Sequence, residues 1–145
     1  MAYTTVSAIQ DEFKNITFSA STYPTSTAVS EFITQEEYLL DAEVGTVYTT
    51  PITGTMALSV MKLMSTLMVK ARVMEILTVK TGSSDEDQGN PADDLRQRVR
   101  DMLDKIKSKL LILSDATLLE TSGGVRDYNS NNDITQTFKA TTDQW

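Results

Sequence analysis

The sequence predicts an all-α fold, a small helical bundle of about four helices with a long central helix and an extended C-terminal arm. Apolar residues recur at intervals of three and four in four segments, which is the period of an amphipathic helix. Joints that contain Pro or Gly separate the segments, and a region rich in Thr, Asn, Asp and Gly follows Ser114. The 145 residues suit one core. We therefore divide the chain into a helical domain, residues 1–114, and an arm, residues 115–145.

The first helix is expected over residues 5–13. Its apolar stripe consists of Val6, Ile9 and Phe13. Thr4 or Thr5 should cap its N-terminus, because a hydroxyl oxygen can accept a hydrogen bond from a free N–H of the first turn. A loop rich in Ser and Thr follows, in which Pro24 disfavours helix.

The second helix should begin near Thr27 and must stop before Pro51. Its expected apolar face consists of Ala28, Val29, Phe32, Ile33, Leu39, Leu40 and Val44. Most of its acidic side chains, Glu31, Glu36, Glu37 and Asp41, are expected on other faces. This segment is therefore expected to bury one side and leave a polar side in water.

The third helix is expected from Thr53 or Thr55, either of which could cap it, to about Lys80. Gly82 is its stop signal. Its apolar residues are Met56, Val60, Leu63, Met64, Leu67, Met68, Val69, Ala71, Val73, Met74, Ile76 and Leu77. So wide an arc needs neighbours on more than one side. The segment is thus either the central helix of a bundle or a helix that another subunit also covers.

The fourth helix is expected over residues 91–113, with Asn90 as N-cap and Pro91 in the first turn. Its apolar seam consists of Leu95, Val99, Met102, Leu103, Ile106, Leu110 and Leu113. Its many basic and acidic side chains are most simply a solvated face with ion pairs. The arm that follows is polar, with scattered apolar anchors. We predict that four of them bind a partner: Tyr128, Ile134, Phe138 and Trp145.

Several classes of chemistry are disfavoured by the composition. The chain has no Cys and no His, which removes thiolate and zinc–His sites and the commonest general base near neutral pH. The acidic loop 85–87 lacks the ligand spacing of a calcium loop and is interpreted as solvated. We expect no enzyme activity, no cofactor and no metal. A carboxylate enzyme would need two acids converging in a pocket, and the acids lie on faces and loops.

The net charge of −7 makes nonspecific binding of nucleic acid unfavourable, since that binding requires Lys and Arg to neutralise phosphates. The N-terminus has no signal-peptide pattern. The most apolar stretch, residues 56–77, carries four charged side chains, so no membrane span is expected. We therefore expect synthesis in the cytoplasm.

Three stretches make the chain resemble the head-tail connector (adaptor) proteins of tailed bacteriophages. They are "YTTVSAIQDEF" (Tyr3–Phe13), "AVSEFITQEEYLLDAEVGTVYTTPIT" (Ala28–Thr53) and "ALSVMKLMSTLMVKARVMEIL" (Ala57–Leu77). They correspond to the opening short helix of that family, its second helix with a Pro-bearing joint, and its long central helix. The resemblance covers about the first half of the chain and rests on helix order and joint chemistry.

The resemblance implies a virion protein that forms a ring, typically a dodecamer, beneath the portal protein. A stopper or tail protein would bind the other face, and genomic DNA would pass through the central channel without sequence-specific binding. The location would be the neck of the virion, at the head-tail interface. The alternative is a small soluble helical adaptor or regulatory binding module whose C-terminal arm folds on its partner.

Overall fold

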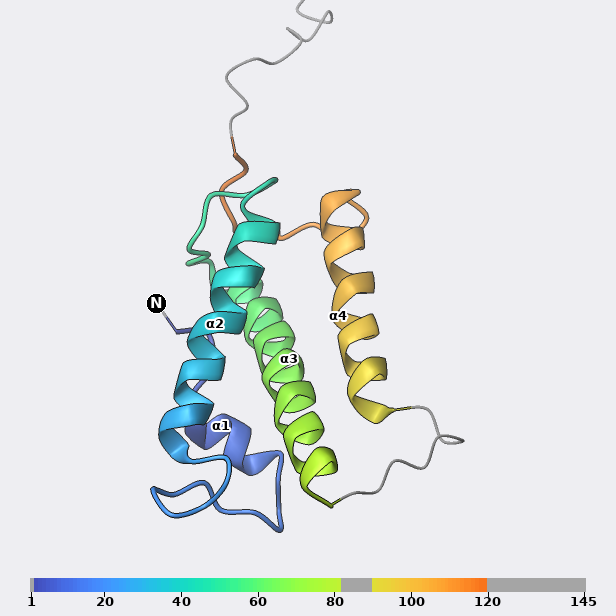
Figure 1. Cartoon of the computed structure of the whole chain (residues 1–145). Coiled ribbons are helices and arrows are strands. Elements are labelled where there is room, and N and C mark those ends of the chain that lie inside the picture. The colour runs from blue at the N-terminus through green and yellow to red at the C-terminus, as the bar shows by residue number, and fades with distance from the viewer. Residues whose placement is uncertain (1, 82–89, 120–145) are drawn as a thin grey trace, which may run out of the picture.

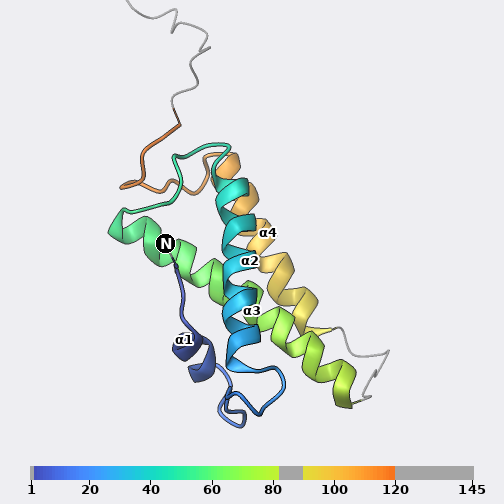
Figure 2. The ribbon, with the colours of Figure 1, turned by 60° about the vertical axis from the view of Figure 1, so that its left-hand side comes forward.

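The structure is a computed structural model that describes residues 2–81 and 90–119, and these ranges form four helices and no strand. The helices are α1 (Val6–Asp11), α2 (Ser26–Val44), α3 (Thr55–Thr81) and α4 (Pro91–Lys107). Neighbouring long helices run in opposite directions, and α3 lies between α2 and α4 while α1 packs beside α2 and α3 (Figures 1 and 2). The predicted all-α bundle with a long central helix is confirmed.

Three helices begin at local caps that the sequence carries. Thr5 Oγ1 accepts from Ala8 N at 3.2 Å, and Thr25 Oγ1 accepts from Ala28 N at 3.1 Å. Asn90 Oδ1 accepts from Ala92 N at 3.1 Å, with Pro91 in the first turn of α4 as predicted. α2 therefore starts at Ser26, one residue before the expected Thr27, because Thr25 supplies the cap.

The core has two parts, and α3 runs through both. The larger part lies where the second half of α2, the first half of α3 and α4 meet. Its buried residues are Tyr3, Leu40, Val44, Tyr48, Ile52, Ala57, Met61, Met64, Leu67, Val99, Ile106 and Leu113. The smaller part joins α1, the start of α2 and the second half of α3. Its buried residues are Ile9, Phe18, Val29, Ile33, Val69 and Val73. The wide apolar arc of α3 is thus explained by neighbours on two sides.

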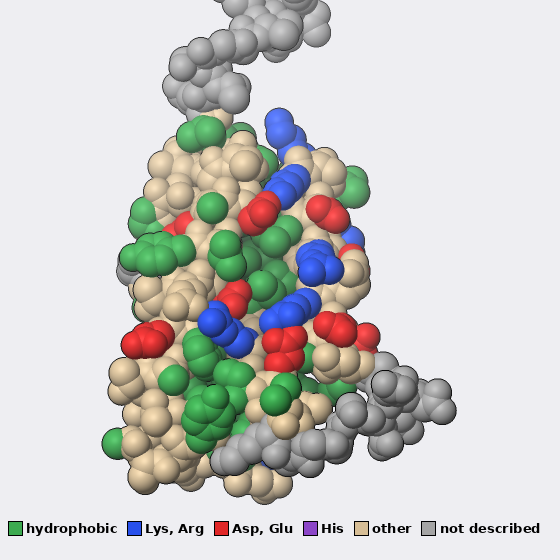
Figure 3. All heavy atoms as spheres, in the orientation of Figure 1, with side chains coloured by type: hydrophobic (Ala, Val, Ile, Leu, Met, Phe, Trp, Pro, Cys, Tyr) green, Lys and Arg blue, Asp and Glu red, His purple; other side chains and the backbone are tan. Residues whose placement is uncertain are grey.

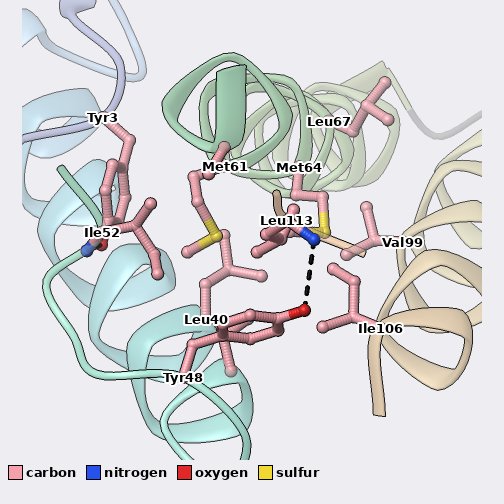
Figure 4. Close-up of a cluster of buried hydrophobic side chains, with 12 residues drawn as sticks. Tyr3, Leu40, Tyr48, Ile52, Met61, Met64, Leu67, Val99, Ile106 and Leu113 are labelled. Carbon is pink, nitrogen blue, oxygen red and sulfur yellow. Dashed lines mark hydrogen bonds between the residues drawn. The ribbon is translucent and has the colours of Figure 1, made fainter. Parts of the chain in front are cut away.

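Two methionines of α3, Met61 and Met64, lie buried in the larger core part. Met61 and Met64 point from α3 toward Leu40 and Tyr48, and Val99 and Ile106 close this part from α4 (Figure 4). The Tyr48 hydroxyl accepts a hydrogen bond from Leu113 N at 3.2 Å, so the chain beyond α4 is tied to the joint between α2 and α3. An unbranched thioether adapts to such irregular space between three helices.

The end of α4 differs from the prediction. The helix stops at Lys107 rather than Leu113, and Lys109 adopts a left-handed conformation with φ of 59°. Leu110 is consequently 81% exposed instead of lying on the apolar seam, whereas Leu113 still reaches the core from the turn. The Ser108 hydroxyl donates to the Asp104 carbonyl. Such a bond from a side chain to the backbone competes with the regular hydrogen bonds of the helix at its last turn.

The faces of α2 and α3 also contain corrections. Leu39 is 57% exposed although its spacing fits the apolar stripe, and Met56 and Leu63 are exposed on α3. Glu36 and Glu37, which were expected outside the core, are buried. Their burial has a physical reason, because each carboxylate has polar partners described below.

Candidate interaction site

Asp115 closes the N-terminus of α3 from a distance of almost sixty residues. Its Oδ2 accepts from Met56 N at 2.6 Å and its Oδ1 from Ala57 N at 2.9 Å. These two backbone hydrogen bonds favour the charged carboxylate and lower the pKa of Asp115. Gly54 precedes the helix, and a Cβ at this position would collide with the Asp115 backbone. The cap predicted at Thr53 or Thr55 is therefore supplied instead by a remote side chain.

A short antiparallel pairing continues this attachment. Tyr48 and Leu118 form an isolated bridge, in which Thr49 N donates to the Thr117 carbonyl and Leu119 N donates to the Val47 carbonyl, both at 2.8 Å. With the Asp115 cap and the Tyr48–Leu113 bond, these contacts fix the segment that leaves α4. The first residues of the predicted arm thus lie against the helical part.

Four exposed aliphatic side chains lie in this attached segment, which occupies one end of the bundle (Figure 1). We call them the end surface: Leu110, Ile112, Leu118 and Leu119. They stay exposed while Leu111 and Leu113, between and beside them, turn inward. These side chains all lie at the same end of the bundle, which makes this end a candidate contact surface.

A second exposed apolar group lies on α2. Tyr38 is 71% exposed and Leu39 lies next to it, and we call this pair the α2 patch. The helix contains no Lys or Arg, and Glu31 and Glu43 are its only exposed acids. By contrast, every exposed residue of α4 other than Pro91 has a polar side chain, and most are charged. The outer side of α2 is thus far less charged than that of α4.

The N-terminal segment is held by a buried carboxylate. Glu37 Oε1 accepts from Tyr3 N at 2.7 Å, from Thr4 N at 2.9 Å and from the Ser65 hydroxyl at 3.2 Å. Thr4 Oγ1 lies 3.1 Å from Thr66 Oγ1. Glu37 therefore joins the N-terminal segment, α2 and α3, and its burial is compensated by these bonds.

The Tyr3 side chain extends the same connection toward the joint between α2 and α3. Its hydroxyl donates to Asp41 and accepts from Ile52 N at 3.0 Å. Burial and the bond to Asp41 raise the pKa of Tyr3 well above its usual value. The carboxylates of Glu37 and Asp41 are thus occupied in holding the chain together.

Ion pairs link the helices to one another. Arg96 of α4 binds Glu75 of α3 at 2.7 Å, and Lys107 of α4 binds Glu43 of α2. Figure 3 shows such acidic and basic side chains around apolar side chains between α2 and α4. On the same helices Arg72 pairs with Glu36 at 3.3 Å and lies 4.3 Å from the centre of the Phe32 ring. The predicted ion pairs of α4 therefore connect helices rather than neighbouring turns.

An open hollow of about 370 Å³ lies at the far end of α3 from the end surface. It is lined by Tyr23, Glu75, Ile76 and Val79. Glu75, its charged group, already binds Arg96. Within residues 2–81 and 90–119, no three His, Cys, Asp or Glu side chains converge as metal ligands.

The predicted partner-binding residues, Tyr128, Ile134, Phe138 and Trp145, lie outside the described residues, as does the acidic loop 85–87. The end surface and the α2 patch were not predicted. Leu39 and Leu110 were assigned to buried faces because their spacing fits a helical stripe. Helical periodicity in the sequence predicts which residues are apolar on one side of a helix, but it does not distinguish a buried residue from an exposed apolar residue on a neighbouring face.

Comparison with protein-family models, with curated proteins and with solved structures gave no match. Among the helices of the described ranges, none combines the length and the apolar character needed to cross a membrane.

Proposed function

We propose that the chain is a structural virion protein, a head-tail connector subunit that forms a ring beneath the portal protein and joins the head to a stopper or tail protein. The main support is the presence of exposed apolar groups at two separate places, the α2 patch and the end surface. A subunit in a ring contacts a neighbour on each side as well as the layers above and below. Such a subunit needs several contact surfaces on a small body.

The bonds between the helices also support this role. The Asp115 cap, the Glu37 bonds and the ion pairs tie α2, α4, the residue after α1 and the segment after α4 to α3. A connector has to transmit position between two larger assemblies, which requires a body that keeps its shape. The net charge of −7 suits a channel whose wall repels the phosphates of passing DNA. The resemblance of the first half of the sequence to phage connectors is the reason for proposing this particular assembly, a ring beneath the portal protein.

The decisive test is the location of the chain in virions. Antibodies against the chain, labelled with gold, should bind only at the neck, between capsid and tail. Mass spectrometry of the same virions should find the chain at ring stoichiometry relative to the portal protein. Virions that contain none of the chain would overturn the proposal and favour the soluble adaptor.

A second experiment addresses the contact surface itself. The double substitution Tyr38→Ser and Leu39→Ser should reduce incorporation into particles at least about tenfold while leaving the melting temperature unchanged, because both side chains are exposed. The matched control is Thr34→Ser with Gln35→Ser, which alters exposed polar residues one turn earlier on the same helix. Normal incorporation of the Tyr38/Leu39 variant would exclude the α2 patch as a subunit contact.

A further inference from the structure

One side of the first half of α3 is not covered by any described segment. α2, α4 and the N-terminal segment contact α3 through its buried and half-buried residues. Four exposed residues lie on the remaining side, and we call them the α3 outer face: Met56, Ser59, Lys62 and Leu63. Their spacing of three and four residues places them side by side on the helix.

The α3 outer face is apolar and basic. Met56 is 70% exposed, and Leu63 is the second large apolar side chain of this face. Lys62 forms no ion pair within the described part of the chain. Glu75, the single acid of α3, is bound to Arg96 of α4 and does not neutralise it. The face therefore presents two apolar side chains beside an uncompensated positive charge.

The outer side of α2 has the complementary character. It carries Tyr38 and Leu39 of the α2 patch, and Glu31 lies on the same side of the helix, seven residues before Tyr38. Glu31 is exposed and forms no ion pair among residues 2–81 and 90–119, whereas Glu43 is paired with Lys107. This side therefore presents apolar side chains beside an uncompensated negative charge.

The spacing of these groups matches when the two helices lie antiparallel. Tyr38 follows Glu31 by seven residues, which is about 10.5 Å along α2. Met56 precedes Lys62 by six residues, which is about 9 Å along α3. An antiparallel contact can therefore join Glu31 to Lys62 while the two apolar side chains also meet.

The two faces cannot meet within one chain. Met61 and Met64 of α3 point toward Leu40 of α2, so the core lies between the two helices (Figure 4). The outer sides of α2 and α3 consequently face in opposite directions. A contact made from two different faces is heterologous, and its repetition gives a ring when the rotation closes.

We propose that the outer side of α2 in one copy docks on the α3 outer face of a second copy of this chain, with Glu31 of one copy paired to Lys62 of the other. This inference rests on the proposed function, because it names the surfaces through which neighbouring subunits of the ring meet. α4 fits the α2 patch less well, since its exposed residues other than Pro91 are polar.

The first test traps this contact with a disulfide. Gln35 and Ser59 are exposed, uncharged and opposite each other in the antiparallel register, and the native chain contains no Cys. Virions that carry the double variant Gln35→Cys and Ser59→Cys should give a ladder of covalent multimers on a non-reducing gel after oxidation with copper phenanthroline. Each single variant is the matched control and should stay monomeric, because its thiol has no second thiol opposite it.

The outcomes of this test are distinct from those for the proposed function. Virions that contain the chain but give no ladder would overturn the inference and leave the proposed function standing. Virions without the chain would overturn both. A covalent dimer of the Gln35→Cys variant alone would show that two α2 helices meet symmetrically, and would overturn the heterologous contact.

The second test exchanges the two charges. Glu31→Lys and Lys62→Glu should each reduce incorporation into particles at least about threefold, because like charges then face each other. The chain with both substitutions should recover to within about twofold of the native level. All three variants should keep the native melting temperature, since both side chains are exposed.

The control combines Glu31→Lys with Arg98→Glu, which reverses an exposed charge on α4 instead, and it should not recover. Equal incorporation of Glu31→Lys with and without Lys62→Glu would overturn the pairing of Glu31 with Lys62.

Discussion

Adjacent side chains in α3 have opposite environments. Met64 is fully buried between α2 and α4, whereas Leu63 is 43% exposed. Both are large apolar residues in the same long helix, so their surroundings rather than their chemistry decide their contribution to stability. Tyr3 and Tyr38 differ in the same way, since one is enclosed and hydrogen-bonded and the other lies in the α2 patch. These pairs allow each substitution to be compared with a matched one.

The substitution Met64→Asp should abolish the folded state. The substitution places a carboxylate among the apolar side chains of the larger core part. The loss in free energy of unfolding should be about 4 kcal/mol or more. Because small domains have only about 5–15 kcal/mol of stability, the melting transition should be lost or shifted far down. Circular dichroism during heating measures this. Leu63→Asp should melt near the native temperature, and an unchanged Met64→Asp melt would contradict burial of Met64.

The substitution Tyr3→Phe should destabilise the fold by about 1–3 kcal/mol. It removes the hydroxyl while keeping the ring, so Asp41 loses a donor and Ile52 N loses its acceptor. Urea denaturation of the two proteins measures the difference. Tyr38→Phe should change the free energy of unfolding by less than about 0.5 kcal/mol, because its hydroxyl is in solvent. Equal effects of the two substitutions would exclude a role for the Tyr3 hydroxyl.

At the scale of elements, the helix starts fall into two kinds. Thr5, Thr25 and Asn90 lie next to the helices they cap, so the sequence pattern can find them. α3 is capped by Asp115, which the chain brings back only after α4 and its turn. The α3 cap therefore depends on the tertiary fold and couples the end of the described chain to the start of the central helix.

This coupling should depend on pH. Asp115→Asn keeps one acceptor oxygen but loses the charge at the helix N-terminus, so its melting temperature at neutral pH should be lower than that of the native chain. The bonds from Met56 N and Ala57 N hold the pKa of Asp115 below the ordinary 3.8. A lowered folded pKa gives stability that is present above the unfolded pKa and is lost as the pH falls through the folded pKa. The difference in melting temperature should thus shrink below about pH 3.8.

The control for this experiment is Asp104→Asn, which removes an exposed carboxylate from α4. Its melting temperature should follow the native chain at both neutral and acidic pH. A pH-independent difference between Asp115→Asn and the native chain would indicate that the charge of Asp115 does not contribute to the cap.

At the scale of the whole molecule, the sequence predicts what local patterns determine. The four helices, the central position of α3 and the start of α4 follow from periodicity and capping residues. The end of α4 could not be predicted, because the apolar run 110–113 continues the stripe after the backbone has turned at Lys109. Burial of Glu37 could not be predicted either, since its partners come from the N-terminal segment and α3. The α2 patch and the end surface depend on which apolar positions the other helices leave uncovered.

The last prediction concerns the arm as a whole. Deletion of residues 122–145 should leave the helicity and the melting temperature nearly unchanged, because both core parts and the Asp115 cap lie in residues 2–119. It should weaken assembly into particles, since the predicted anchors are removed. Circular dichroism and incorporation into particles measure the two effects. A full-length variant with Ser in place of the four predicted anchors, Tyr128, Ile134, Phe138 and Trp145, distinguishes the effect of the anchors from the effect of the arm's length. This variant should assemble as poorly as the truncated chain. Loss of helicity on truncation would mean that the arm belongs to the folded domain.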